Sequence, residues 1–120
     1  MTEELGFHRG DVFLLCLDPV EDSEQGGTRP VLVITNDILN THNPVVTVAA
    51  ITTRKVDRVY PTEVLIIPPE GGLNQPSKVL LYQTRTVSKR RAIRYLGQLS
   101  QKAMSKVDEA IRLSLGLISI

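Results

Sequence analysis

The sequence is short of several residue types, and each shortage excludes a class of protein. Its 120 residues include no tryptophan and only 4% aromatic residues, so a base-stacking platform built from several rings is not expected. The net charge is only +1, from 14 Lys and Arg against 13 Asp and Glu. Electrostatic binding of duplex nucleic acid over a large surface needs an excess of basic residues and is therefore not expected either. Any contact with nucleic acid must come from a local group of arginines.

Cysteine and long apolar runs are also scarce. The single cysteine, Cys16, can form neither an internal disulfide nor a zinc site, and its place in the apolar run 12–17 favours a core position over a nucleophile. The acidic first six residues lack the basic and apolar parts of a secretory signal. The longest apolar stretches, such as 45–51, fall well short of the ~20 residues of a membrane-spanning helix. We therefore expect a cytoplasmic protein with no membrane partner.

Length and composition predict one small globular domain that spans residues 1–120. The chain is 42% hydrophobic and 22% charged, which is typical of a folded domain. Short apolar runs rich in β-branched residues recur between turn residues. They predict strands at residues 11–18, 30–34, 45–52, 62–67, 78–87 and 92–99. Several short strands at this spacing favour a barrel or sandwich over alternating βαβ units.

The last part of the chain changes its hydrophobic period. After Ser100, a residue type that often caps helices, apolar positions follow at spacings of three and four, and Gly116 lies near the expected end. The stripe consists of Met104, Val107, Ala110, Ile111, Ser114 and Leu115. It predicts an amphipathic helix packed across one face of the barrel, as core or dimer contact. The predicted fold class is thus mainly β with α.

Polar residues gather where the predicted strands meet three long connections, at residues 20–29, 53–61 and 68–77. Long connections on a small scaffold are where function tends to reside, and the second one, with Arg54, Lys55, Asp57 and Arg58, is expected to be mobile and mostly basic. A guanidinium fork from Arg29 and a hydroxyl from Thr52 together suit a phosphate. Equally acceptable is a surface pair between Arg29 and Glu24, with the threonines serving only the strands.

Several motifs follow one another in order from about Arg9 to Leu117. They are Asp-Pro-Val at 18–20, Ser-Glu-Gln-Gly-Gly-Thr-Arg-Pro at 23–30 with its apolar continuation to 34, Asn-Asp-Ile at 36–38, Ala-Ala-Ile-Thr at 49–52, Thr-Glu-Val at 62–64, Gln-Thr-Arg-Thr-Val-Ser-Lys at 83–89 and Val-Asp-Glu-Ala at 107–110. By these motifs the chain resembles the MazF/PemK/Kid family of toxin endoribonucleases. The resemblance implies an SH3-like β-barrel, a homodimer, a MazE-like antitoxin partner, and cutting of single-stranded RNA without a metal or other cofactor.

The resemblance also assigns roles to individual residues. Arg29 and Thr52 are its implied catalytic pair. The implied RNA-binding residues are Ser23, Gln25, Asn36, Thr53, Gln83 and Arg85, with Ser23, Glu24 and Gln25 lining the RNA groove. The plasmid-borne Kid branch uses an Arg and an Asp just ahead of the Gln and a His in place of the Ser. Leu80, Tyr82 and Ser23 occupy those positions here, so the chromosomal MazF branch is the better match.

In metal-free RNA cleavage the 2′-hydroxyl of the substrate is the nucleophile, and the products are a 2′,3′-cyclic phosphate and a 5′-hydroxyl. Preorganised donors aimed at the charged phosphate give the largest rate effect. Arg29 is expected in this role rather than as a general acid, because a guanidinium releases its proton only with difficulty. Thr52 is the second donor, and Glu24 is the candidate acceptor of the 2′-proton. A Glu24 salt bridge that merely orients Arg29 is an equal alternative.

Two other functions remain open at this point. One is a non-catalytic toxin on the same barrel, like the CcdB relatives that poison DNA gyrase. The other is a degenerate member that binds only RNA or antitoxin, suggested by Asp22, which stands where the family usually has Gly. His8 and His42 are expected at the surface, with no orienting carboxylate nearby, rather than as a two-histidine ribonuclease. The basic run 89–91 with Arg94 is either a solvated face or a holder of flanking phosphates.

Overall fold

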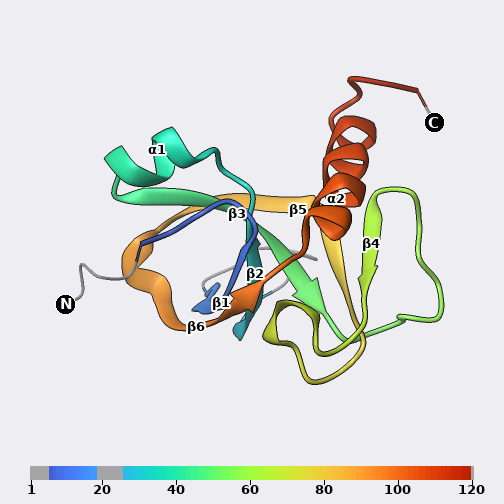
Figure 1. Ribbon diagram of the computed structural model, residues 1–120, viewed down its shortest axis with the longest axis horizontal. Helices are drawn as coiled ribbons and strands as arrows, with labels where there is room; N and C mark the ends of the chain where they lie inside the picture. The colour runs from blue at the N-terminus through green and yellow to red at the C-terminus, as the bar shows by residue number, and fades with distance from the viewer. Residues whose placement is uncertain (1–5, 19–25, 120) are drawn as a thin grey trace.

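The fold is that of a computed structural model, which describes residues 6–18 and 26–119 (Figure 1). Its strands are β1 (Asp11–Cys16), β2 (Thr28–Val33), β3 (Val45–Thr52), β4 (Glu63–Ile66), β5 (Ser77–Ser88) and β6 (Ala92–Gln98). Its helices are α1 (Asp37–His42) and α2 (Gln101–Ser114), with 3₁₀ turns η2 (Glu70–Gly72) and η3 (Lys89–Arg91). The predicted strands and the C-terminal helix are confirmed, with ends shifted by one or two residues. No helix in the described ranges is long and apolar enough to cross a membrane.

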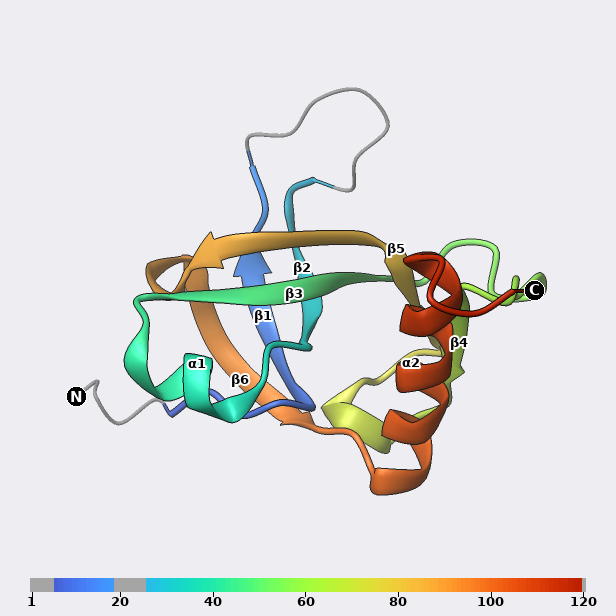
Figure 2. The ribbon, with the colours of Figure 1, turned by 90° about the horizontal axis from the view of Figure 1, so that it is seen from above.

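The strands form one antiparallel sheet in the order β4-β5-β3-β2-β1-β6. β5 is irregular in the middle: Ala49 of β3 faces Thr84, whereas the next residue, Ala50, faces Leu80. Before this irregularity β5 pairs with both β4 and the end of β3, and after it β5 pairs with the start of β3. The sheet curls around an interior, and α2 lies against β4 and β5 (Figures 1 and 2). The prediction of a mainly β fold with a helix is therefore confirmed.

In β1 and β3 both faces are largely buried, which explains why these strands read as nearly continuous apolar runs, whereas β6 and the second half of β5 are partly exposed. Successive side chains of a strand point to opposite faces, so Val12 packs in the cluster beneath α2, whereas Phe13 and Leu15 pack inside the barrel. The barrel cluster is Phe7, Phe13, Leu15, Leu17, Val31, Val33, Val46, Val48, Ala50 and Val87. Cys16, expected in the core, is only partly buried, as is Leu14 on the same face of β1.

The helix α2 begins as its sequence predicts. The Ser100 hydroxyl accepts a hydrogen bond from the backbone N–H of Ala103, 3.1 Å away, and so caps the helix. The backbone N–H of Ser100 donates in turn to the Glu70 carboxylate at 2.7 Å. These bonds to Ser100 hold the pKa of Glu70 below its ordinary value. The cap thus ties α2 to η2, the turn that follows β4.

The other end of α2 corrects one part of the predicted stripe. Met104, Val107 and Ala110 are buried as expected, but Leu115 is 67% exposed. The helix ends at Ser114, and Gly116 takes the left-handed conformation, with φ +76°, that closes many helices. Leu115 therefore lies past the last turn that faces the sheet.

The short helix α1 was not among the elements predicted from the sequence. The side chain of Asn36 accepts a hydrogen bond from the backbone N–H of Leu39 at 2.9 Å and caps the helix. The helix has no buried apolar stripe by which it could be predicted, because Ile38 and Leu39 are 75% and 45% exposed. The available signal was Asn36 followed by Asp37, a capping residue and an acidic first turn.

Candidate active site

Strand register determines where Arg29 and Thr52 lie. Arg29 was expected in the connection before the strand but lies within β2. β2 and β3 pair with Val31 opposite Ala50, and the same register continued by two residues along each strand sets Arg29 opposite Thr52. Residues directly opposite in an antiparallel pair share a face, with Cβ atoms about 5 Å apart. The β2–β3 ladder ends two residues before this point, at Val31 and Ala50, and its register directs Arg29 and Thr52 to the same end and the same face of the two strands.

Each of the two side chains is oriented by nearby backbone. Arg29 is partly buried, and its Nε donates a hydrogen bond to the Gly26 carbonyl at 2.8 Å. Thr52 is only 5% exposed, and its Oγ1 accepts a hydrogen bond from the backbone N–H of Arg54 at 3.2 Å. A hydroxyl that accepts one bond keeps its own hydrogen for another acceptor. Thr52 is thus arranged as a donor at the end of β3.

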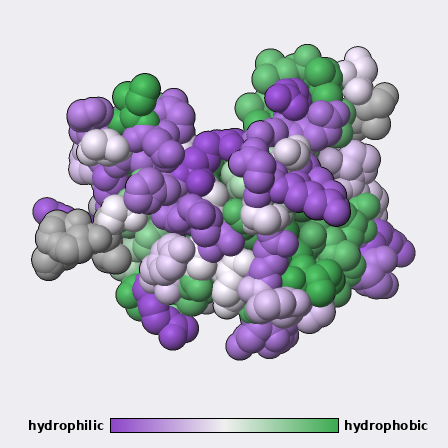
Figure 3. All heavy atoms as spheres, in the orientation of Figure 1, coloured by the Kyte–Doolittle hydropathy of each residue, from purple (hydrophilic) through white to green (hydrophobic). Residues whose placement is uncertain are grey.

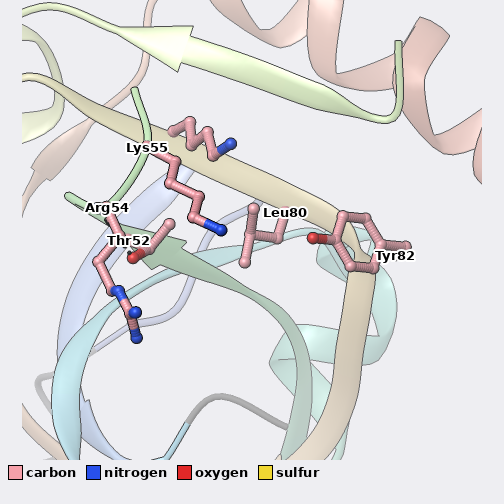
Figure 4. Close-up of a pocket in the computed structure, with 6 residues that line it drawn as sticks. Thr52, Arg54, Lys55, Leu80 and Tyr82 are labelled. Carbon is pink, nitrogen blue, oxygen red and sulfur yellow. Dashed lines mark hydrogen bonds between the residues drawn. The ribbon is translucent and has the colours of Figure 1, made fainter. Parts of the chain in front are cut away.

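A pocket of about 220 Å³ opens beside Thr52 and is lined by Thr52, Arg54, Lys55, Lys78, Leu80 and Tyr82. Its β5 residues alternate along the strand and therefore share one face, with Lys78 directly opposite Thr52. In Figure 4 the Lys55 ammonium and the Tyr82 hydroxyl point toward Leu80, which lies between them, whereas the Arg54 guanidinium points away from Lys55. The pocket is thus polar at its edges and apolar in its middle.

A buried ion pair lies next to this pocket. Glu63 of β4 stands opposite Leu80 of β5, and therefore between Lys78 and Tyr82 on the same face. The Lys78 Nζ lies 2.8 Å from the Glu63 Oε1, and the two side chains are only 6% and 3% exposed. The Tyr82 hydroxyl donates to the other carboxylate oxygen of Glu63 at 3.3 Å. One carboxylate thus holds two residues that line the pocket.

The ion pair also sets the protonation of the groups around it. Burial by itself raises the pKa of Glu63, but the hydrogen bond and charge of Lys78, the backbone N–H of Tyr60 and the Tyr82 hydroxyl outweigh it and hold that pKa below its ordinary value. The pKa of Tyr82 is raised, first by burial and then by the neighbouring Glu63 charge. At neutral pH the carboxylate is therefore ionised and the phenol is a donor.

The connection between β3 and β4, expected to be mobile, is held to β5 by this pair. Besides Glu63, the Lys78 ammonium binds the Arg58 carbonyl at 2.8 Å. The Glu63 carboxylate also accepts the backbone N–H of Tyr60 at 3.1 Å. Inside the connection the Arg58 N–H donates to the Lys55 carbonyl at 3.1 Å and closes a turn. The basic connection beside Thr52 is therefore a fixed part of the site.

Ser23, Glu24 and Gln25, predicted to line the RNA groove, lie outside the described residues, as does Asp22. The base of their connection is described. There the Gly27 N–H donates to the Asp18 carboxylate at 2.9 Å, and the Gly27 carbonyl accepts the N–H of the residue before Asp18 at 2.9 Å. These bonds close the stem of the connection one residue before β2 begins. The roles predicted for Ser23, Glu24 and Gln25 stay predictions.

The other four predicted RNA-binding residues are spread over the fold. Thr53 is exposed just after β3, and Gln83 is partly buried in the irregular part of β5. The Arg85 guanidinium donates to the Leu17 carbonyl and braces the stem after β1. Asn36 caps α1, at the opposite end of β2 from the pocket. Arg85 and Asn36 thus have structural partners, and RNA contacts by the four stay predictions.

The basic run that follows β5 is largely bonded to backbone. The Lys89 ammonium donates to the Asn40 carbonyl and lies 5.5 Å from the centre of the Phe7 ring. The Arg91 guanidinium donates to the Cys16 carbonyl at 3.2 Å. Two of the three cations in this run therefore hold neighbouring segments in place rather than forming a solvated face.

Both histidines lie at the surface, as expected. His42 is exposed in the last turn of α1, and the His8 side chain is 65% exposed. One expectation is corrected, because the buried Asp11 carboxylate lies 3.7 Å from the His8 Nδ1. In residues 6–18 and 26–119 no group of three or more His, Cys, Asp or Glu side chains is arranged to hold a metal ion.

Sequence reasoning did not assign a role in the site to Lys55, Glu63, Lys78 or Tyr82. A signal was present in β5, where Lys78, Leu80 and Tyr82 occupy alternate positions of a predicted strand. A lysine in an otherwise apolar strand calls for a buried partner. Only the pairing of β4 with β5 shows that this partner is Glu63.

Known proteins of similar sequence cover almost the whole chain. Endoribonuclease EndoA of Bacillus subtilis is 47% identical over 110 residues, which is 92% of this chain and 95% of the relative. Endoribonuclease MazF of Staphylococcus saprophyticus is 48% identical over 112 residues, 93% of each chain. The sequence model of PemK-like, MazF-like toxins of type II toxin-antitoxin systems matches residues 8–115.

Solved structures agree with these sequence matches. A mycobacterial endoribonuclease in complex with its cognate antitoxin superimposes with a TM-score of 0.79 at 27% identity, covering 95% of this chain and 99% of the other. The Mycobacterium tuberculosis toxin MazF-mt6 gives 0.76 at 32% identity, covering 91% and 99%. The expected MazF-like barrel is thereby confirmed. Since the family model and both sequence relatives span nine-tenths of the sequence, the chain belongs to the family of PemK-like, MazF-like toxins of type II toxin-antitoxin systems.

Proposed function

We propose that this protein is the toxin of a type II toxin-antitoxin system and acts as a metal-independent, sequence-specific endoribonuclease on single-stranded RNA. Its family and the names of its two endoribonuclease relatives support the activity. The observation that supports the proposal for this chain is the β2–β3 register: it ends at Val31 opposite Ala50 and, extended by two residues along each strand, would set Arg29 opposite Thr52. A guanidinium and a hydroxyl converging from adjacent strands can bind one phosphodiester from two sides.

In the proposed reaction the 2′-hydroxyl oxygen of the RNA attacks the adjacent phosphorus, and the bond from phosphorus to the 5′ oxygen breaks. Arg29 stabilises the negative charge that develops on the phosphate oxygens, and Thr52 donates a second hydrogen bond. Glu24 takes the proton of the 2′-hydroxyl, and the leaving 5′ oxygen takes a proton from water. The products are a 2′,3′-cyclic phosphate and a 5′-hydroxyl. DNA lacks the nucleophile and is spared.

The proposal includes partners and a location. A homologous mycobacterial endoribonuclease is solved with its cognate antitoxin, and we propose a MazE-like antitoxin for this chain. An acidic antitoxin segment complements the cations at the Thr52 pocket in the way the RNA backbone does. A homodimer and a cytoplasmic location, where single-stranded RNA is available, complete the proposal.

The activity is tested with a fluorogenic single-stranded RNA designed from the 5′ ends left after digestion of a long mixed RNA. Removing one donor to the phosphate raises the barrier by about 3 kcal/mol, so Arg29→Ala is expected to cut about a hundredfold more slowly. Arg112→Ala is the matched control, because that arginine is 53% exposed on α2.

Three results would contradict the proposal in whole or in part. Undiminished cleavage by Arg29→Ala removes Arg29 from the mechanism. Intact RNA with the unaltered protein, together with inhibition in a gyrase supercoiling assay, identifies a non-catalytic toxin. Silence in both assays identifies a protein that only binds RNA or antitoxin.

A further inference from the structure

The cations around the pocket differ in what they bond to. The Lys78 ammonium is already bonded to the Glu63 carboxylate and the Arg58 carbonyl, at 2.8 Å each. Arg54 and Lys55 both line the pocket, and the Lys55 ammonium points toward Leu80 in its middle, whereas the Arg54 guanidinium points away from Lys55 (Figure 4). Among the described residues, the ion pairs involve other cations, and none joins a carboxylate to Lys55. Lys55 is therefore a cation that points toward the middle of the pocket and has no carboxylate partner among the ion pairs of the described residues.

The backbone of Lys55 supports this assignment. Its φ is +52°, in the left-handed region that residues with a Cβ rarely adopt. Such conformations persist where the surrounding structure fixes them, and they cluster at ligand-binding sites. Here the turn closed by the Arg58 N–H and the Lys55 carbonyl carries the strained residue. The backbone conformation of Lys55 is thus imposed by the connection and is not the one that the residue prefers by itself.

The buried ion pair fixes that connection. The Lys78 ammonium donates a hydrogen bond to the Arg58 carbonyl, and the Glu63 carboxylate accepts one from the Tyr60 N–H. Both members of the pair therefore bind the segment that follows Lys55. A buried ion pair adds little to stability compared with an apolar pair of the same size, but its bonds are directional. An apolar pair would fill the space without placing the connection.

We propose that Lys55 binds the RNA phosphate next to the scissile one, and that the Glu63–Lys78 ion pair is a positioning unit that holds Lys55 there. The inference rests on the proposed function. In the sheet, β3 lies between β2 and β5. Arg29 lies on the β2 side of Thr52, whereas the pocket with Lys55 lies on the β5 side. A strand whose scissile phosphate lies between Arg29 and Thr52 brings its next phosphate to Lys55.

Lys55→Gln tests the phosphate contact. Loss of one charged hydrogen bond is expected to raise KM about tenfold while kcat stays within about twofold of the unaltered protein. Binding is measured with the same oligonucleotide carrying a 2′-deoxy sugar at the cut, which removes the nucleophile. The slope of log Kd against log salt is expected to fall by about 0.7, the value for one single-strand phosphate. Lys55→Arg keeps the charge and is expected to retain binding.

Lys102→Gln is the matched control, since Lys102 is exposed on α2 and its loss removes the same charge. Cleavage, KM and salt slope are expected to be unchanged in it. If Lys55→Gln behaves like this control while the unaltered protein cuts RNA, the inference is overturned and the proposed function stands. If the unaltered protein cuts no RNA, the proposed function itself fails.

The positioning role is tested by a double-mutant cycle. In the variant Glu63→Gln/Lys78→Met the connection loses its anchor, and adding Lys55→Gln is then expected to raise KM less than about threefold. A tenfold effect of Lys55→Gln in both backgrounds would overturn the positioning role, because a merely structural pair leaves the Lys55 effect unchanged. Circular dichroism establishes that the variant is folded. If it is not, Glu63→Leu/Lys78→Met, which also removes both buried charges, takes its place with the same two outcomes.

Discussion

The Glu63–Lys78 pair makes the stability of the protein depend on pH in a specific direction. Burial, which alone raises the pKa of Glu63, is outweighed by the bonds and charge of Lys78 and by the Tyr60 N–H, so the folded pKa lies below the ordinary 4.5. A carboxyl with a lowered folded pKa stabilises the fold above its unfolded pKa, and this contribution is lost as the pH falls through the folded pKa. Asp11 acts in the opposite direction, because burial raises its pKa.

We predict that Glu63→Gln/Lys78→Met loses less free energy of unfolding than the unaltered protein when the pH falls from 7 to about 3. Asp11 is present in both proteins, so its contribution cancels in the comparison. Glu63→Gln alone is expected to be about 3–5 kcal/mol less stable at pH 7, because it leaves the Lys78 charge buried without a partner. Urea unfolding at the two pH values measures both effects. Parallel pH curves for the two proteins would contradict the prediction.

Individual residues also show how much of the candidate site could be predicted from the sequence. Arg29 and Thr52 were identified by the family resemblance, and the β2–β3 register is consistent with their pairing. Lys55 and Tyr82 were not assigned, because nothing local in the sequence states which way a side chain in a connection or an irregular strand points. Arg85 was expected to bind RNA, yet its guanidinium bonds to Leu17, 68 residues away in sequence.

Among the elements, β6 and η2 meet by an unusually close backbone approach. A Cβ on Gly97 of β6 would lie 2.7 Å from backbone atoms of both Gly71 and Gly72. Backbone cannot yield as a flexible side chain can. The contact therefore requires glycine at position 97, and it brings the turn after one edge strand of the sheet against the other edge strand.

Gly97→Ala is accordingly expected to lower the free energy of unfolding by about 1–3 kcal/mol, the usual effect of overpacking. Gly6→Ala serves as the control, since its Cβ would meet only the movable ring of His8, at 3.3 Å. Urea unfolding at neutral pH compares the two variants. An unchanged urea midpoint for Gly97→Ala would show that η2 and β6 can move apart without loss of stability.

Strands such as β1 and β3 were predictable as elements because both of their faces are largely buried, which leaves apolar runs between turn residues. The helix α2 was predictable because one face packs on the sheet and the other faces water. The helix α1 satisfies neither condition. It packs by few buried side chains, of which Asn40 is one, and so left only a capping signal.

At the scale of the whole molecule, apolar side chains remain exposed over β4 and near the C-terminal end of α2 (Figure 3). Leu65 and Ile67 are 41% and 55% exposed, and Leu115 and Leu117 are 67% and 70% exposed. Soluble monomers rarely leave large apolar patches uncovered. These surfaces offer contact area for the proposed homodimer.

We predict that light scattering at micromolar concentration gives about twice the 13.3 kDa mass of one chain. Dilution is expected to leave the dimer intact, because obligate homodimers bury large apolar interfaces. A mass of one chain throughout the concentration range would rule out the homodimer.

The sequence by itself determined the class of fold, the approximate bounds of six strands and the C-terminal helix, and, through its ordered motifs, the family. Those properties depend on local patterns of apolar, capping and turn residues. The tertiary structure decided which side chains meet: Glu63 with Lys78 across the β4–β5 ladder, and Lys55 with the pocket beside Thr52. Such meetings depend on strand register and on the irregularity in β5. Both arise from packing between distant segments, so no local pattern encodes them.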